Sequence, residues 1–234
     1  MDYKNALKKF GNYYLSRYDT EFPMIFSMCD FKGKSVLEIG SGNEGHFLKE
    51  LTKYTDKIVA TDISKEILDD LRKNVSIKTK VCKGEKLPFE NRTFDIVFCR
   101  WVLSYFNNLK KGIDEMCRVA AESVLLVFPS EEDDETKMLK IKFKDRYEMR
   151  KQRVKNIKKW LSENGFAVKE KRKTLKFLFP SVDEAVKIMS AMGFQNKLTK
   201  KEKEKLWRFF ENRKTKKGLL FRQGAAFICA TRNN

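Results

Sequence analysis

Short apolar runs alternate along the chain with longer segments in which apolar residues recur every three or four positions. The short runs predict buried strands, because they are brief and are bounded by polar or turn-forming residues. They cover residues 35–39, 57–61, 77–82, 93–99 and 124–128. The periodic segments predict amphipathic helices, which cover residues 46–54, 64–74 and 109–121. Strands that alternate with helices in this way predict an α/β fold built on a parallel sheet.

The last hundred or so residues carry a different pattern. A long helix is predicted over residues 137–161, and further strands are predicted over 166–179 and 223–231. Two helices are expected between these strands. Each begins with a capping box, in which a hydroxyl residue precedes a glutamate by three positions: Ser181 with Glu184, and Thr199 with Glu202.

Glu38 places a carboxylate inside the first apolar run, just before a glycine-rich turn. Burial of a carboxylate is costly unless donors surround it, so we expect a ligand's amine or hydroxyl groups, or backbone N–H groups, beside Glu38. Gly40, Gly42 and Gly45 allow the backbone to turn sharply and let a ligand approach main-chain N–H groups at a helix N-terminus. The turn predicts a nucleotide-type cradle, although glycine-rich turns also occur without a ligand.

A second acid, Asp62, ends the next strand, 22 residues beyond Gly40. In a doubly wound sheet such a carboxylate meets a ribose at the carboxyl edge of the strands. Asp62 is also placed to cap the helix over 64–74, and the two roles are compatible. The segments Gly84-Glu85 and Arg100-Trp101 are expected on the same edge of the sheet.

Composition and length favour an intracellular, cytoplasmic protein. The chain has 234 residues, of which 41% are hydrophobic, enough for a sizeable core. Its longest apolar stretch, residues 124–128, is far too short to span a bilayer, and its first ten residues lack an apolar signal core. The five cysteines are odd in number and contain no C-x-x-C pair, and there is a single histidine. We therefore expect reduced thiols and no ordinary structural zinc site within one chain.

Positive charge is concentrated in the C-terminal half. Residues 1–130 carry a net charge of +3 and residues 131–234 a net charge of +15. Within the long predicted helix, an apolar face lies beside a lysine stripe made of Lys140, Lys144, Lys151, Lys155 and Lys158. The apolar face consists of Phe143, Tyr147, Val154, Ile157 and Leu161. The stripe is either a solvated surface or a track for phosphates such as those of RNA.

Two aromatic groups have two interpretations each. In one interpretation Trp207 stacks on a nucleic-acid base, and in the other it belongs to a core cluster with Leu206, Phe209 and Phe210. The N-terminal aromatics either cover a cofactor or simply pack; they are Phe10, Tyr13, Tyr14 and Tyr18.

Four segments in register resemble one known family. VLEIGSGNEG, VATDIS, GEKLPFENRTFDIVFCRWVLSYF and SVLLVFP follow in the order and spacing of class I S-adenosylmethionine-dependent methyltransferases, in the type 11 subfamily with an L-P-F motif. The resemblance covers roughly residues 12 to 130. It implies a doubly wound, mostly parallel seven-stranded sheet with an antiparallel last strand and a helical insertion, at about 181–217, between strands six and seven. It also implies a single domain, 1–234, made of an N-terminal helical lid (1–30), a cofactor-binding core (31–130) and a basic half (131–234).

The resemblance also implies a role for each site residue. Glu38 matches the acid near the methionine amine of the cofactor, and Gly40, Ser41 and Gly42 lie beside its amino-acid portion. Asp62 matches the acid that holds the ribose hydroxyls, with Ile63 against the adenine. Gly84 and Glu85 match the loop that borders the adenine. Arg100, with its neighbour Trp101, matches the position near the methyl group, and Tyr18 matches a tyrosine that helps close the site.

Two departures from the family pattern concern the cofactor. One extra residue, Asn43 or Glu44, precedes Gly45 and widens the turn. Lys83 stands where the family has an acid facing the adenine, so either Glu85 or the backbone alone is expected to hold the adenine.

The implied activity is in-line transfer of a methyl group from S-adenosylmethionine to a nitrogen or oxygen acceptor on RNA, tRNA or another anionic substrate. A methyltransferase for metabolites is the main alternative, and a non-catalytic cofactor-binding partner subunit is another. A nicotinamide dehydrogenase also fits the glycines and Asp62, but the Glu38 carboxylate would repel a pyrophosphate and the L-P-F motif would have no role. A sulfonium methyl is already activated, so no catalytic base is required. We expect His46 to be structural and Cys99 to lie in the core.

Overall fold

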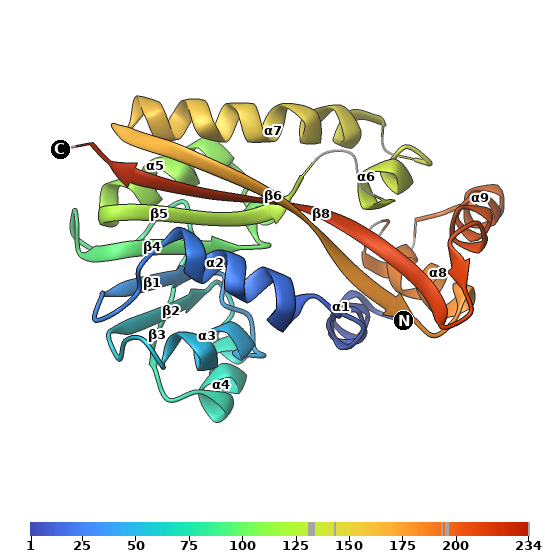
Figure 1. Cartoon of the computed structure of the whole chain (residues 1–234), viewed down its shortest axis with the longest axis horizontal. Coiled ribbons are helices and arrows are strands. Elements are labelled where there is room, and N and C mark those ends of the chain that lie inside the picture. The colour runs from blue at the N-terminus through green and yellow to red at the C-terminus, as the bar shows by residue number, and fades with distance from the viewer. Residues whose placement is uncertain (131–133, 143, 193, 195–196, 234) are drawn as a thin grey trace. The chain divides into compact units, whose positions relative to one another are not determined.

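The structure is a computed structural model that describes residues 1–130, 134–142, 144–192, 194 and 197–233 (Figure 1). Its contacts define two compact units. Unit 1 consists of residues 1–23, 129–153 and 172–225, and unit 2 consists of residues 24–128, 154–171 and 226–234. The expectation of a single domain with a lid stays a prediction.

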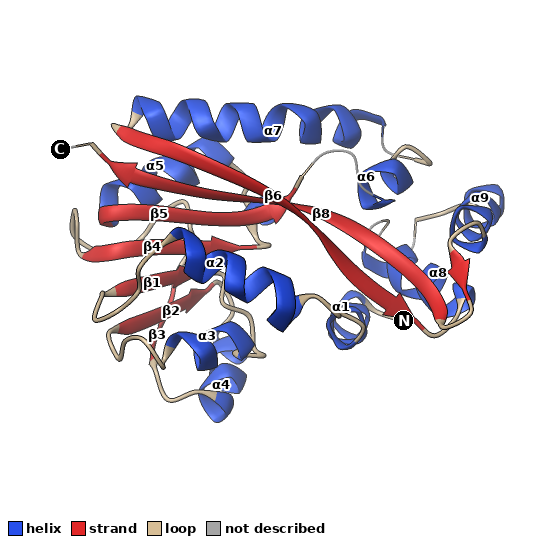
Figure 2. Cartoon of the chain, viewed as in Figure 1, coloured by secondary structure: helices blue, strands red, loops and turns tan. Residues whose placement is uncertain are grey.

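The strands form one eight-stranded sheet of order β3-β2-β1-β4-β5-β8-β6, with β7 paired to β8. Strands β1 to β5 run parallel, whereas β8 runs opposite to β5 (Figure 2). The predicted fold class, a mostly parallel sheet that ends in antiparallel strands, is confirmed. The bounds are β1 Val36–Ile39, β2 Ile58–Asp62, β3 Lys78–Val81, β4 Phe94–Arg100, β5 Ala120–Pro129, β6 Phe166–Phe179, β7 Lys214–Thr215 and β8 Gly218–Arg232.

The helices begin where short polar side chains satisfy free N–H groups. Ser64 accepts from the Ile67 N–H at the start of α4, and the predicted capping box of Thr199 and Glu202 opens α9. The bounds are α1 Tyr3–Asn12, α2 Phe22–Met28, α3 His46–Leu51, α4 Lys65–Asn74, α5 Leu109–Val119, α6 Asp134–Leu139, α7 Lys144–Glu163, α8 Val182–Met192 and α9 Lys200–Glu211. Among the described residues, no helix has both the length and the apolar character needed to cross a membrane.

The core of unit 2 covers both faces of the parallel strands. On one face, Cys99 of β4 is buried in a cluster that includes Ile113 of α5 and Ile157 of α7. On the other face, Phe98 meets Phe47 of α3, with ring centroids 4.6 Å apart. The prediction that Cys99 lies in the core is confirmed, because its side chain is fully buried.

The core of unit 1 is built from aromatic rings. Phe177 of β6 stacks on Phe10 and on Tyr14, with centroid distances of 4.3 and 4.6 Å. Leu206 and Phe210 of α9 are fully buried, as the core interpretation of that cluster predicts. The same interpretation is wrong for Trp207, which is 41% exposed and donates its indole N–H to Asp183.

The prediction of one continuous helix over 137–161 is wrong, because the segment contains two helices. The Lys140 and Ile141 N–H groups donate to carbonyls three residues earlier and close the last turn of α6. The first residue of α6, Asp134, accepts from the Arg213 side chain and the Arg222 N–H, at 2.9 Å each. These two hydrogen bonds anchor the start of α6. Phe143 and the side chains of Lys144, Tyr147 and Lys151 lie outside what the structure describes, while Val154, Ile157 and Leu161 are buried as predicted.

Candidate functional site

The glycine turn lies at the carboxyl end of β1 and is held by its neighbours. Gly40 has φ +69°, and a Cβ there would lie 2.6 Å from a methyl group of Val102, so only glycine fits. Gly42 has φ +64°, but nothing lies within 4 Å of a Cβ built on it. Between them, the Ser41 N–H donates to the Thr61 carbonyl at 2.9 Å. The turn is therefore closed on the side of Val102 and open at Gly42.

Glu38 is the buried acid of the site. It is 2% exposed, and its Oε2 has no hydrogen-bond partner within the described part of the chain. Burial raises the pKa of the Glu38 carboxyl to about 7, against the opposing effects of the Arg100 guanidinium and the Ser41 hydroxyl. A cationic or hydrogen-bond-donating group placed beside Oε2 would satisfy this atom and favour the charged carboxylate.

Asp62 joins the glycine turn to the start of α4. Its carboxylate accepts from the Gly42 N–H at 3.3 Å and from the Ser64 N–H at 3.1 Å. The side chain that caps α4 is the Ser64 hydroxyl, so the predicted capping role of Asp62 is wrong. Asp62 instead accepts from the N–H of the capping residue. The next side chain, Ile63, is 71% exposed. A carboxylate beside an exposed apolar side chain suits a sugar next to a flat ring.

The loop after β3 is packed against the loop after β4. A Cβ on Gly84 would lie 2.4 Å from the Phe106 ring, so the glycine allows close approach. The Glu85 carboxylate accepts from the Asn107 N–H at 2.7 Å. This hydrogen bond holds Glu85 at the start of α5, and it reduces the freedom of Glu85 to take over the role of the missing acid at Lys83.

Arg100 ends β4 near the buried acid. Its guanidinium lies 5.8 Å from the centroid of the Phe47 ring and acts electrostatically on Glu38. Sequence reasoning missed two features here: the contact of Val102 with Gly40, and the positive φ of Trp101, +62°. No sequence signal indicates either, since valine and tryptophan are not residues that mark close approaches or left-handed turns.

Tyr18 is the one predicted site residue outside unit 2. It lies in unit 1, is 59% exposed and meets Phe22 edge-on at 5.3 Å. The other nine predicted residues all belong to unit 2: Glu38, Gly40, Ser41, Gly42, Asp62, Ile63, Gly84, Glu85 and Arg100. The role of Tyr18 stays a prediction.

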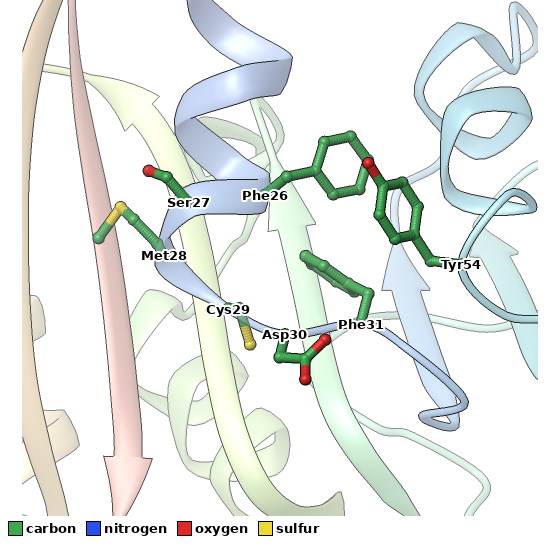
Figure 3. A pocket seen from close by; sticks show the side chains of 7 residues that line it. All are labelled: Phe26, Ser27, Met28, Cys29, Asp30, Phe31 and Tyr54. Atoms are coloured by element: carbon green, nitrogen blue, oxygen red, sulfur yellow. The ribbon is translucent and has the colours of Figure 1, made fainter.

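A separate cavity of about 390 Å³ is lined by residues that precede β1 and by Tyr54 (Figure 3). Its lining includes Phe26, Cys29 and Phe31, which precede β1, and Tyr54, which follows α3. These residues adjoin the amino end of β1, whereas the glycine turn follows its carboxyl end. The cavity is therefore distinct from the candidate site.

Residues 37–128 match the family model of the methyltransferase domain, and they run from β1 into β5 and include nine of the ten predicted site residues. This part of the chain is therefore similar to a methyltransferase domain. Wheat (Triticum aestivum) phosphoethanolamine N-methyltransferase 1 is 34% identical over 96 residues, which are 38% of this chain and 19% of that protein. This chain covers less than half the length of each of the curated relatives compared with it.

Solved structures of methyltransferases share the fold of this chain. YcgJ of Bacillus subtilis, an uncharacterised methyltransferase, is 30% identical over 90 residues, 36% of this chain and 35% of its own. Its crystal structure superposes with a TM-score of 0.64 at 18% identity, over 91% of this chain and 98% of that one. Magnesium protoporphyrin IX methyltransferase from Synechocystis was solved with bound SAH. Its structure superposes with a TM-score of 0.55 at 15% identity, over 91% of this chain and 80% of that one. S-adenosylmethionine is the cofactor of this domain class.

Proposed function

We propose that the protein transfers a methyl group from S-adenosylmethionine to a nitrogen or oxygen acceptor on RNA, tRNA or another anionic substrate. The observation that carries the proposal is Glu38, a buried carboxyl with an unsatisfied oxygen beside an open glycine turn. The ammonium of the cofactor's methionine portion is a group that satisfies such an atom. The protein is expected to act in the cytoplasm.

Each site residue receives a role in this proposal. Glu38 holds the cofactor's amine, and the turn over residues 40–42 lies beside its amino-acid portion. Asp62 accepts from the ribose hydroxyls, and Ile63 covers one face of the adenine, with Gly84 and Glu85 along its edge. Arg100 lies toward the methyl group, and Tyr18 closes the site.

The bound cofactor supplies a methyl group on a sulfonium, which is already activated for displacement. The chain's own contribution is to align the acceptor in line with that methyl group and to exclude water. Neither task requires a side chain that takes up a proton during transfer, and we assign none.

Calorimetric titration with S-adenosylmethionine tests the cofactor site. Asp62→Ala removes the acceptor for two hydroxyl groups and is expected to weaken binding at least about tenfold. Asp69→Ala is the matched control, because Asp69 is an acid on the exposed side of α4, in ion pairs with Lys65 and Arg72. Unchanged affinity in Asp62→Ala would show that the ribose placement is wrong.

The preference for an anionic substrate rests on charge. The half of the chain from residue 131 onward carries a net charge of +15, and Lys140 and Lys155 are exposed. Lys158 is less available, because it pairs with Glu170 at 2.9 Å. A solvated lysine surface remains the alternative for this stripe.

A metabolite acceptor is the second candidate, and the similarity to a phosphoethanolamine N-methyltransferase favours it. Phosphoethanolamine is itself anionic at its phosphate and nucleophilic at its amine, so the positive charge of the chain suits it as well. The two candidates differ in salt dependence, because binding of a polyanion weakens steeply as salt rises.

One experiment separates these candidates: methyl transfer from radiolabelled S-adenosylmethionine into a cell extract that is then divided into RNA, protein and small-molecule fractions. Label in RNA that is reduced by charge reversal at Lys144, Lys151 and Lys155 supports the RNA acceptor. Label in small molecules alone supports the metabolite. A protein that binds the cofactor and transfers no label would instead be a partner subunit.

A further inference from the structure

Trp101 has a backbone conformation that its side chain disfavours. Its φ is +62°, and the only other described non-glycine residue with positive φ is Arg92, at +55°. A left-handed conformation brings Cβ too close to the following carbonyl, and a bulky residue there is a genuine outlier. Such strain persists where the surrounding structure fixes it, and it often coincides with function.

The surroundings of Trp101 fix its backbone on both sides. The Trp101 N–H donates to the Val127 carbonyl of β5 at 2.8 Å. The next residue, Val102, has its methyl groups against Gly40, and Leu103 is 2% exposed. The turn at Trp101 is therefore held between β5 and the glycine turn of the proposed cofactor site.

Packing alone does not explain this turn. Along β4 the side chains alternate, with Phe98 and Arg100 toward Phe47 and with Cys99 in the cluster on the other face. An extended residue 101 would continue onto the face of Cys99, where a large apolar side chain is stabilised by burial. Instead the chain turns, and the indole stays partly exposed at the carboxyl edge of the sheet.

We propose that Trp101 is an acceptor-specificity residue, whose strained turn keeps the indole at the carboxyl edge of β4 to receive an amine nitrogen. This inference rests on the proposed function, because Arg100 and Glu38 define where the methyl group is offered. An indole face attracts a cation more strongly than the other aromatic side chains do.

The chemistry of transfer suits an indole. The lone pair of the acceptor nitrogen forms a bond to the methyl carbon while the carbon–sulfur bond breaks. The electron pair of the broken bond stays on sulfur, which becomes a neutral thioether. Positive charge therefore moves from sulfur to nitrogen, and the new ammonium later loses a proton to solvent. An indole beside the nitrogen favours the state in which this charge has arrived, so it raises the rate of transfer and not only the affinity.

The test compares three variants of the full chain: Trp101→Gly, Trp101→Phe and Arg92→Gly. Arg92→Gly is the matched control, because it removes the Cβ from the other residue with positive φ. Arg92 is exposed in a turn, and its N–H donates to the Arg118 carbonyl. Thermal melting, calorimetric binding of S-adenosylmethionine and radiolabel transfer into a cell extract are measured for each. Both glycine variants are expected to melt at or above the wild-type temperature, because the cost of a left-handed Cβ is removed.

The variants are then expected to differ in transfer. Trp101→Gly should bind S-adenosylmethionine within about twofold of wild type and transfer at least about tenfold less label, whereas Trp101→Phe should recover most of the transfer. Arg92→Gly should transfer as wild type does. Wild-type transfer by Trp101→Gly, or a lower melting temperature with a parallel loss of transfer, would overturn the inference.

Two further outcomes concern the acceptor. Label that mild alkali releases as methanol marks an ester oxygen and would overturn the assignment of an amine. If the wild-type chain transfers no label to any fraction, the proposed function fails, and the melting comparison between the two glycine variants still decides whether Trp101 is strained.

Discussion

Glu38 offers a direct test of the electrostatics of the site, because its buried carboxyl links stability to pH. The pKa of Glu38 is about 7 in the folded chain, raised by burial from an ordinary value of 4.5. Between these values the folded state holds a proton that the unfolded state has lost. The free energy of unfolding therefore falls as pH rises from 4.5 to 7, and the loss is complete above pH 7.

The magnitude follows from the difference between the two pKa values. A change from 4.5 to about 7 corresponds to about 3 kcal/mol of stability lost above pH 7. Glu38→Gln is neutral at every pH and has nearly the same shape. The variant should differ from wild type by no more than about 1 kcal/mol near pH 5, where Glu38 is still protonated in the folded chain, and exceed it by up to about 3 kcal/mol at pH 8.

Urea denaturation without cofactor, at pH 5 and at pH 8, measures this difference. Subtraction of the wild-type value at each pH cancels the titration of all other groups. Glu90→Gln, at an exposed loop position, controls for the loss of one negative charge. If Glu38→Gln changed stability equally at both pH values, the carboxyl would be charged throughout, and the desolvation reasoning for this site would be wrong.

Two further predictions concern the framework around the site and in unit 1. Gly40→Ala should cost about 2 kcal/mol or more in thermal unfolding, because its Cβ would meet Val102, whereas Gly42→Ala, with the same sign of φ and open space, should cost about 1 kcal/mol; equal costs would contradict the contact with Val102. Asp134→Ala should lower urea stability by about 2 to 3 kcal/mol, because it leaves Arg213 and the Arg222 N–H without their acceptor. Asp70→Ala, in an exposed ion pair with Lys73, should have little effect, and an equal loss there would remove the special role of Asp134.

The parallel part of the fold was predictable because burial alone determines its pattern. The strand that contains Glu38 and the one that contains Cys99 are mostly apolar and are buried along nearly their whole length, as a sheet covered on both faces requires. The site residues followed from the same pattern, since glycines and acids that end such strands meet at one edge. The matches at Glu38 and Asp62 needed no knowledge of side-chain contacts.

The features that the sequence did not predict depend on contacts between distant residues. The start of α6 is held by the bonds of Asp134 to Arg213 and Arg222, about 80 to 90 positions later. Apolar periodicity continues across the break, so a helical pattern alone joins the two helices. The left-handed turn at Trp101 likewise depends on Val127 and Gly40, which local propensity does not include.

Glu38 and Trp101 share one physical property: each is held in a state that is unfavourable in the free chain. A charged Glu38 lacks a partner for Oε2, and Trp101 has a disfavoured φ. A ligand that satisfies Oε2 must bind the charged carboxylate more tightly than the neutral acid, so it lowers the pKa of Glu38 and releases a proton near pH 7. Affinity for S-adenosylmethionine should therefore rise between pH 6 and pH 8 in wild type and stay nearly constant in Glu38→Gln. Calorimetry in buffers of different ionisation enthalpy counts the released proton, and the absence of that proton would mean that Glu38 does not meet the cofactor's amine.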